Sequence, residues 1–255
     1  AAGAVGMGIV KPGMLSATIG TSGVIFAVTD EPKLDLKGRI HTLCHAVPGR
    51  WHNTGVTLSA GLSFKWFREN LGGGLSYDQL TDEASEIPSG SNGLLWLPYL
   101  MGERTPHLDP NARAAFVGLT ASHTRAHMTR AVFEGVAFSL RDSIEIFREL
   151  GARMESVRLG GGGATSEHWR QVQADVYGMP CETIEAEEGA AFGAAILAGV
   201  GAGEWSSVDE ACEMSIRTNL RIDPDEKSSR VLDANYRAYS KLYDALKPVI
   251  AALGQ

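Results

Sequence analysis

The sequence has few cysteines, no long apolar run and a deficit of basic charge. Its cysteines are isolated and form no C-x-x-C pair, which fits a reducing cytoplasm and buried thiols: Cys44, Cys181 and Cys212. No apolar stretch is long enough to span a bilayer, and no signal peptide is recognisable. We therefore expect a cytoplasmic protein that does not bind membranes.

Acidic residues outnumber basic ones, 30 against 23, and the formal net charge is -7. This excess of negative charge argues against nonspecific nucleic-acid binding and against an anionic membrane surface as partners. Hydrophobic residues make up 44% of the 255 positions and charged residues 21%, which is enough apolar chain for a globular core. The chain starts at Ala1 without a methionine, so we expect it to begin inside a longer protein.

Glycine is abundant, and four glycines form one run at positions 160–163. The run follows an alternating, strand-like segment, Ser156–Leu159, and precedes apolar residues at helical spacing from Trp169 onward. Glycine here permits positive φ and close approach of a flat ligand, and Ser166 is the expected N-cap of a helix whose N-terminus favours anions. This pattern is typical of a nucleotide site, although a tight turn without ligand fits it equally well. It is neither a Walker loop nor a G-x-G-x-x-G fingerprint.

A β-hairpin is expected near the start of the chain. The alternating runs Leu15–Ile19 and Val24–Thr29 flank Gly20-Thr21-Ser22-Gly23. A glycine-bounded tip with free N–H groups and two hydroxyls suits phosphate oxygens, but an ordinary hairpin turn explains the same residues.

A second hairpin is expected at Ile40–Val47 and Trp51–Leu58, followed by a helix that Ser59 would cap. The two strands hold three histidines without a carboxylate or cysteine at ligand spacing, so surface or core histidines are expected and no metal site: His41, His45 and His52.

Four later segments bear on the fold and the function. A long helix is expected to open at Ser122 or Thr124 and to run to Leu150, with an apolar stripe that faces the core. Gly102–His107 places opposite charges beside a proline turn, where a charged pair is usually solvated. Glu188–Val200 is an expected helix whose small residues allow close approach to a neighbour or a ligand. The segment 230–253 is expected to form one closing helix, bent at Pro248.

This order of elements resembles the C-terminal lobe of sugar kinases with the actin/hexokinase-like (ribonuclease H-like) α/β fold, a mixed sheet flanked by helices. The resemblance is sharpest between Ala114 and Glu134, which is similar to the second signature of the FGGY carbohydrate kinases. Gly102–His107 is most similar to the family members that act on xylulose. The constrained signature positions are Ala114, Phe116, Gly118, Leu119, His127, Met128, Ala131, Val132, Phe133 and Glu134.

The resemblance implies that residues 1–255 form the C-terminal nucleotide-binding lobe of an ATP- and Mg²⁺-dependent kinase that converts D-xylulose to xylulose 5-phosphate. Glycerol, ribulose and gluconate are alternative substrates. A chaperone-type or filament ATPase of the same fold and a nicotinamide-binding module are alternative classes. The partners implied are ATP or ADP, a pentulose in the intact enzyme, the N-terminal lobe and a second copy in a homodimer.

The resemblance also assigns site residues by position. It places Thr21 at the β- and γ-phosphates and makes the small-residue helix near Gly189 and Gly193 the backing of the nucleotide pocket. It implies no catalytic residue on this chain, because the family's general-base aspartate and its sugar-binding lobe precede the segment that starts at Ala1. His107 is the nearest replacement base, and a surface histidine is the more ordinary reading of it. The chain alone is therefore expected to be inactive. The implied nucleotide-binding residues are Gly20, Thr21, Ser22, Gly61, Lys65, Gly162, Gly163 and Ser166.

Overall fold

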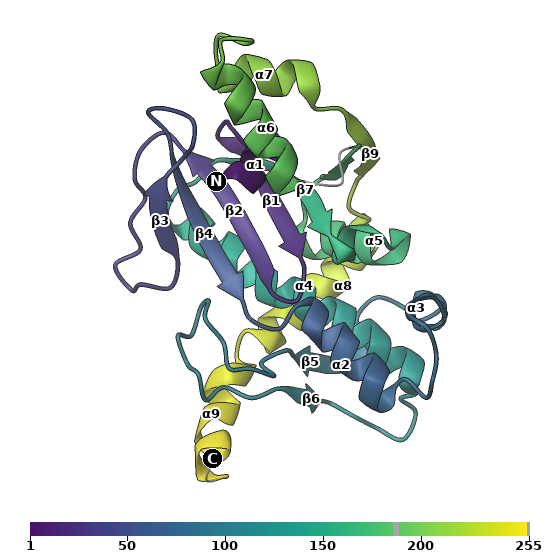
Figure 1. The fold of residues 1–255 in the computed structure, drawn as a ribbon. Helices are drawn as coiled ribbons and strands as arrows, with labels where there is room; N and C mark the ends of the chain where they lie inside the picture. The colour runs from purple at the N-terminus through teal and green to yellow at the C-terminus, as the bar shows by residue number, and fades with distance from the viewer. Residues whose placement is uncertain (186–188, 254–255) are drawn as a thin grey trace.

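A seven-stranded mixed sheet forms the centre of the protein in the computed structural model, which describes residues 1–185 and 189–253 (Figure 1). The strand order is β3-β4-β2-β1-β7-β8-β9. β1, β7 and β8 are parallel neighbours, and the remaining pairs are antiparallel. The strands are β1 (Gly13–Ile19), β2 (Gly23–Thr29), β3 (His41–Cys44), β4 (Trp51–Thr57), β7 (Met154–Gly161), β8 (Cys181–Ile184) and β9 (Thr218–Ile222).

Helices cover both faces of the sheet, as the alternation in β1 and β2 requires. Leu15 and Ile25 belong to the large core on the side of α4 (Arg125–Glu149), with α5 (Glu167–Tyr177) and α8 (Glu226–Tyr239). Phe26 and Val28 point the other way, toward α1 (Ala2–Gly6). Figure 1 shows α1 and α6 (Gly189–Gly201) lying together over one face of the sheet.

The remaining elements lie beside this three-layered unit. They include a small antiparallel pair, β5 and β6, next to α2 and α4 (Figure 1). Among the described residues, no helix is both long and apolar enough to cross a membrane. The bounds are α2 (Gly61–Leu71), α3 (Tyr77–Ser85), η1 (Ser91–Gly93), β5 (Leu95–Leu97), β6 (Ala115–Val117), η2 (Gly162–Ala164), α7 (Val208–Ser215) and α9 (Leu242–Ala252).

Glycines let α1 and α6 cross at backbone contact. A Cβ added to Gly193 would lie 1.8 Å from the carbonyl oxygen of Ala2, and one added to Gly6 would lie 1.8 Å from that of Gly189. The small residues of α6 therefore allow it to pack closely against α1. These contacts do not test the implied role of α6 as the backing of the nucleotide pocket. Glu188, the expected first residue of this helix, lies outside the described residues.

Most predicted elements are confirmed, including both hairpins and the long helix, which begins after Thr124. The predicted Ser59 cap is wrong. The N-cap of α2 is Ala60, which has no capping side chain, because the first N–H groups of this helix bond to a neighbouring loop instead. The single closing helix is also wrong. It is two helices, α8 and α9, which part at Ser240 and Lys241, and Pro248 lies inside α9.

Candidate functional site

Two glycine-containing loops meet at one edge of the sheet because β1 and β7 are parallel neighbours. Ile19, the last residue of β1, pairs with Gly161, the last residue of β7. Gly161 has a φ of 71°, and a Cβ there would lie 2.5 Å from the carbonyl oxygen of Ile19. A Cβ on Gly163 would lie 2.6 Å from the side chain of Ile19. Glycine at both positions is therefore needed for the loops to touch.

The tip of the first hairpin is anchored to the start of α2. The N–H groups of Ala60 and Leu62 donate to the carbonyl of Thr21, at 3.1 Å each, and Gly61 donates to that of Gly20 at 2.8 Å. A Cβ on Gly61 would lie 2.4 Å from the oxygen of Gly20, so this glycine serves the contact with the tip.

This anchoring decides which polar groups of the tip remain available. The carbonyls of Gly20 and Thr21 accept from the start of α2, and that of Ser22 accepts the N–H of Gly20. The backbone N–H groups and hydroxyls of Thr21 and Ser22 bond to nothing in the part of the chain that the structure describes. Unbonded N–H groups in a tight turn form a concavity suited to an anion. The tip thus presents donors at the same edge as the 161–166 loop.

The other predicted residues lie around this edge. Ser166 caps α5 as expected, and its Oγ accepts the N–H of Trp169 at 3.1 Å. Lys65 lies one turn into α2, with its side chain 59% exposed and its Nζ 4.0 Å from a carboxylate oxygen of Glu69. Gly61, Gly162, Gly163 and the tip are brought together, while the ammonium of Lys65 lies on the solvent side of its helix.

A cavity of about 630 Å³ opens beside Ser166, between α3 and the start of α5. A second cavity of about 410 Å³ shares Ser85, His168 and Gln171 with it. These volumes fall in the range of small-molecule sites, which is about 300–1,000 Å³. The first cavity is lined by Asp78, Thr81, Asp82, Ser85, Thr165, Ser166, Glu167, His168 and Gln171.

A buried ion pair on α4 supports these cavities. Arg130 and Glu134 are 5% and 1% exposed, and Arg130 Nε donates to Glu134 Oε1 at 2.6 Å. Glu134 also accepts the N–H of Gly90 at 2.9 Å, and Arg130 Nη2 donates to the hydroxyl of Ser89 at 3.0 Å. The pair therefore fixes the segment that leads into η1. The family signature includes Glu134 but does not predict this structural role. The i,i+4 spacing of Arg130 and Glu134 is the sequence feature that could have predicted the ion pair.

The same arginine reaches the glycine loop through His168. Arg130 Nη1 donates to His168 Nε2 at 2.8 Å, so the imidazole is a neutral acceptor with its proton on Nδ1. Burial, followed by the charge of Arg130, lowers the pKa of His168 to about 4. A chain of contacts thus runs from the buried carboxylate of Glu134 to the first turn of α5.

Glu103 departs most clearly from expectation. The sequence predicts a solvated pair with Arg104, but Glu103 is 2% exposed, and the guanidinium of Arg104 contacts His41 instead. The Glu103 carboxylate accepts the hydroxyl of Thr57 at 2.5 Å and the N–H of Leu58 at 3.0 Å. Burial raises the pKa of Glu103 to about 7.

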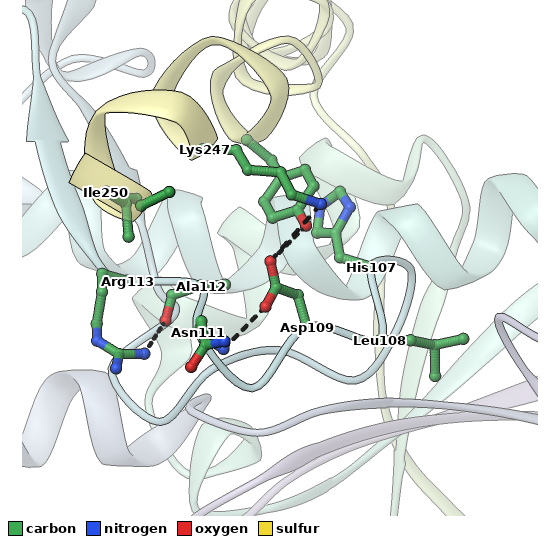
Figure 2. Close-up of a pocket in the computed structure, with 10 residues that line it drawn as sticks. His107, Leu108, Asp109, Asn111, Ala112, Arg113, Lys247 and Ile250 are labelled. Carbon is green, nitrogen blue, oxygen red and sulfur yellow. Dashed lines mark hydrogen bonds and ion pairs between the residues drawn. The ribbon is translucent and has the colours of Figure 1, made fainter. Parts of the chain in front are cut away.

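His107 lines a separate cavity of about 450 Å³ that shares no lining residue with the two cavities beside α5. Figure 2 shows His107 and Asp109 across from Lys247 of α9. The ring of His107 stacks on Tyr243 with centroids 3.6 Å apart, and its Nε2 lies 3.1 Å from the hydroxyl of Tyr99. Burial lowers the pKa of His107 to about 4. His107 is therefore a packed histidine, not a surface one.

Comparison with known proteins gives a consistent result. Residues 15–202 match the C-terminal domain of the FGGY family of carbohydrate kinases. The xylulose kinase of Bacillus subtilis is 40% identical over 253 residues, which is 99% of this chain and 51% of that protein. The gluconokinase of the same organism is 35% identical over 88% of this chain and 46% of its own length.

The structural comparison agrees. The structure of a ligand-bound xylulose kinase from Lactobacillus acidophilus superposes with a TM-score of 0.93 at 27% identity, over 99% of this chain and 51% of that chain. The chain therefore spans about half the length of the relatives that it matches.

Proposed function

Because the chain belongs to the FGGY family of carbohydrate kinases, we propose that it is the nucleotide-binding half of a kinase that phosphorylates D-xylulose at the expense of ATP. Family membership favours a kinase over a nicotinamide-binding module and over a chaperone or filament ATPase. The observation that carries the nucleotide assignment is the meeting of the hairpin tip with the 161–166 loop, beside a cavity that the same loop lines.

The geometry supports a division of roles. The N–H groups and hydroxyls of Thr21 and Ser22 receive the β- and γ-phosphates, since these donors have no acceptor among the described residues. Gly162, Gly163 and Ser166 lie against the ribose and adenine at the cavity between α3 and α5. Gly20 and Gly61 shape the tip. Lys65, whose exposed ammonium lies near Glu69, would have to turn from the solvent side of α2 to add positive charge at the bound nucleotide.

Mg²⁺ is assigned to the nucleotide phosphates, where it neutralises the charge that develops during phosphoryl transfer. The sugar-binding surface and the general-base aspartate are assigned to the other half of the enzyme. Transfer requires the sugar hydroxyl to be held in line with the γ-phosphate, and such positioning supplies about 7–11 kcal/mol. We therefore expect this chain alone to form no xylulose-dependent ADP. We place the enzyme in the cytoplasm, in keeping with its free cysteines.

Calorimetric titration of the chain with MgADP tests the nucleotide site. Gly162→Val is the informative variant, because its Cβ would lie 3.8 Å from the nearest atom and the fold tolerates it. Gly201→Val is the control, since nothing lies within 4 Å of a Cβ at that position. We expect heat of binding for the wild-type chain and the control, and much less for Gly162→Val. Equal heats for all three proteins would refute the loop assignment.

Turnover requires both halves of the enzyme. There, Thr21→Val should lower kcat more than nucleotide affinity, by about 10²–10³ if its hydroxyl orients the transferring group. A coupled ADP assay measures turnover. Unchanged turnover would show that the tip is only a hairpin turn with no role in phosphoryl transfer. Because the gluconokinase of B. subtilis is nearly as similar to this chain, the assay should compare D-xylulose with gluconate. A preference for gluconate would overturn the proposed substrate and leave the nucleotide site intact.

A further inference from the structure

The buried carboxylate of Glu103 is held firmly in place by its own loop. Glu103 and Asp109 exchange two backbone hydrogen bonds, each 2.9 Å long, and so close the loop between β5 and β6 on itself. A Cβ on Gly102 would lie 2.7 Å from the backbone of Pro110, so the two ends of this loop touch. The side chain of Glu103 thus projects from a fixed base into the core.

Every polar contact of this carboxylate is with a donor. Thr57 Oγ1 donates to Oε2 at 2.5 Å, and the N–H groups of Leu58 and Arg104 donate to Oε1 at 3.0 and 2.7 Å. Thr57 is the last residue of β4, and Leu58 begins the connection to α2. The carboxylate therefore holds Thr57 and Leu58, the corner at which the chain leaves the sheet, by hydrogen bonds.

That corner controls the hairpin tip by two routes. Thr57 pairs with Gly23, the first residue after the tip, and a Cβ on Gly23 would lie 2.7 Å from the methyl group of Thr57. Beyond Leu58, the N–H groups of residues 60–62 bond to the carbonyls of Gly20 and Thr21. A displacement of the corner is thus transmitted to both ends of the tip.

We propose that Glu103 is a positioning residue for the hairpin tip, which it holds through Thr57 and Leu58 in the orientation that receives the β-phosphate of a nucleoside diphosphate. This role rests on the proposed nucleotide function. It is distinct from a general structural role, because the effect should appear only for ligands that carry a phosphate at the tip. Adenosine monophosphate, which lacks the β-phosphate, depends on the 161–166 loop and the cavity instead.

The charge state of Glu103 changes the strength of its hydrogen bonds to the corner. The protonated form could still bond to all three partners, with Oε1 accepting from the N–H groups of Leu58 and Arg104 and Oε2 donating to the hydroxyl of Thr57. Hydrogen bonds to an ionised carboxylate are stronger, however, so the ionised form holds these groups more tightly. Burial and, to a smaller extent, the charge of Asp142 on α4 raise the pKa of Glu103 to about 7. The charge of Glu103 in turn helps burial to raise the pKa of Tyr99 and, on α8, the pKa of Tyr239. The preference for ADP over AMP should therefore increase as the pH rises through about 7.

The test is calorimetric titration of the chain with MgADP and with AMP, for Glu103→Ala, Glu103→Gln and the control Asp142→Asn. Asp142 is a second, partly buried carboxylate with a raised pKa, but it bonds to the hydroxyl of Tyr236 and not to the corner. Glu103→Ala should weaken ADP binding about tenfold, the equivalent of one hydrogen bond, while leaving AMP binding within about twofold. The titrations are compared at pH 8, where Glu103 is mainly ionised whether or not Asp142 carries a charge, and there Asp142→Asn should leave the ratio of the two affinities unchanged.

Glu103→Gln provides the pH readout. Its amide can accept from the N–H groups and donate to Thr57, but it cannot ionise, so its preference for ADP should not rise between pH 6 and 8. Protonation of the nucleotide affects both proteins and cancels in the comparison. A pH rise retained in Glu103→Gln would overturn the assignment of the titrating group. Equal weakening of ADP and AMP by Glu103→Ala, or no weakening of either, would overturn the positioning role.

Hydrogen exchange separates this proposal from the function on which it rests. If the wild-type chain binds neither nucleotide, the proposed function fails, but the amides of residues 58–62 still report on the corner. Their exchange should be faster in Glu103→Ala than in Asp142→Asn, while that of β7 stays the same in both. Unchanged exchange at residues 58–62 would overturn the positioning role independently.

Discussion

Replacing Glu134 with alanine should produce one of the largest losses of stability available on this chain. The side chain is 1% exposed, and Oε1 accepts hydrogen bonds from Arg130 at 2.6 Å and from the backbone of Gly90 at 2.9 Å. Burial raises the pKa of Glu134, and the charge of Arg130 opposes that effect. Removing the carboxylate leaves the guanidinium of Arg130, only 5% exposed, without an ion-pair partner among the residues that the structure describes.

The magnitude follows from what is left behind. Breaking a buried ion pair by removing one partner costs about 3–5 kcal/mol, because the remaining charge stays desolvated. A domain of this size has a total stability of about 5–15 kcal/mol, so Glu134→Ala should bring the protein close to unfolding. Glu134→Gln keeps the shape and the acceptor for Arg130 and Gly90, and should cost about 1–3 kcal/mol.

Urea unfolding followed by tryptophan fluorescence measures these differences. Glu69→Ala is the control, since Glu69 pairs with Lys65 at the same i,i+4 spacing but on the surface, and its loss should change stability by about 0.5 kcal/mol or less. Replacing both partners, Arg130→Met with Glu134→Leu, should cost less than Glu134→Ala alone, because no charge is then stranded. A double variant as unstable as the sum of its single changes would refute the stranded-charge account.

Two further predictions concern packing and titration. Gly193→Ala should destabilise the chain by about 1–3 kcal/mol, because its Cβ would lie 1.8 Å from the oxygen of Ala2; a melting temperature equal to that of Gly201→Ala would contradict this. Burial raises the pKa of Asp142 from 3.8 to about 7, so the folded state holds this proton more tightly than the unfolded state does. The stability that Asp142 contributes is full below pH 3.8 and is lost as the pH rises through about 7. The free energy of unfolding of Asp142→Asn, measured by urea titration, should therefore rise relative to that of the wild type between pH 5 and pH 8.

Local patterns were sufficient to locate the two loops of the candidate site. Alternation on either side of Gly20–Gly23 predicts a hairpin, and the change from strand to helical spacing around Gly160–Gly163 predicts a turn between a strand and a helix. Both signals depend only on neighbours in sequence. That the loops touch depends on the parallel pairing of β1 with β7, which joins residues about 140 positions apart. The resemblance to a family assigned both loops to one nucleotide site and so implied that they lie close together, but no sequence pattern predicted the strand pairing that brings them there.

The errors at Ser59 and Glu103 share one physical cause, which is a polar group whose partner lies far along the chain. Ser59 precedes a helix and has the right side chain for a cap, but the N–H groups it would receive are already bonded to Gly20 and Thr21. Glu103 stands beside Arg104 in a loop, and adjacency suggests a solvated pair. Its actual donors, Thr57 and Leu58, come from a strand end that only the tertiary fold brings near.

The signature stretch on α4 includes a residue that holds neighbouring elements of the site in place rather than taking part in the reaction. Glu134 lines neither cavity beside α5, and Arg130 reaches only the wall of the smaller one. The pair instead binds the segment before η1 on one side and His168 on the other. His168 stands two residues after the N-cap Ser166, so any movement of the pair shifts the first turn of α5 and the loop before it. A loop of glycines has little intrinsic preference for one shape. Its shape must therefore come from rigid neighbours, and a buried, fully bonded ion pair is a source of such rigidity.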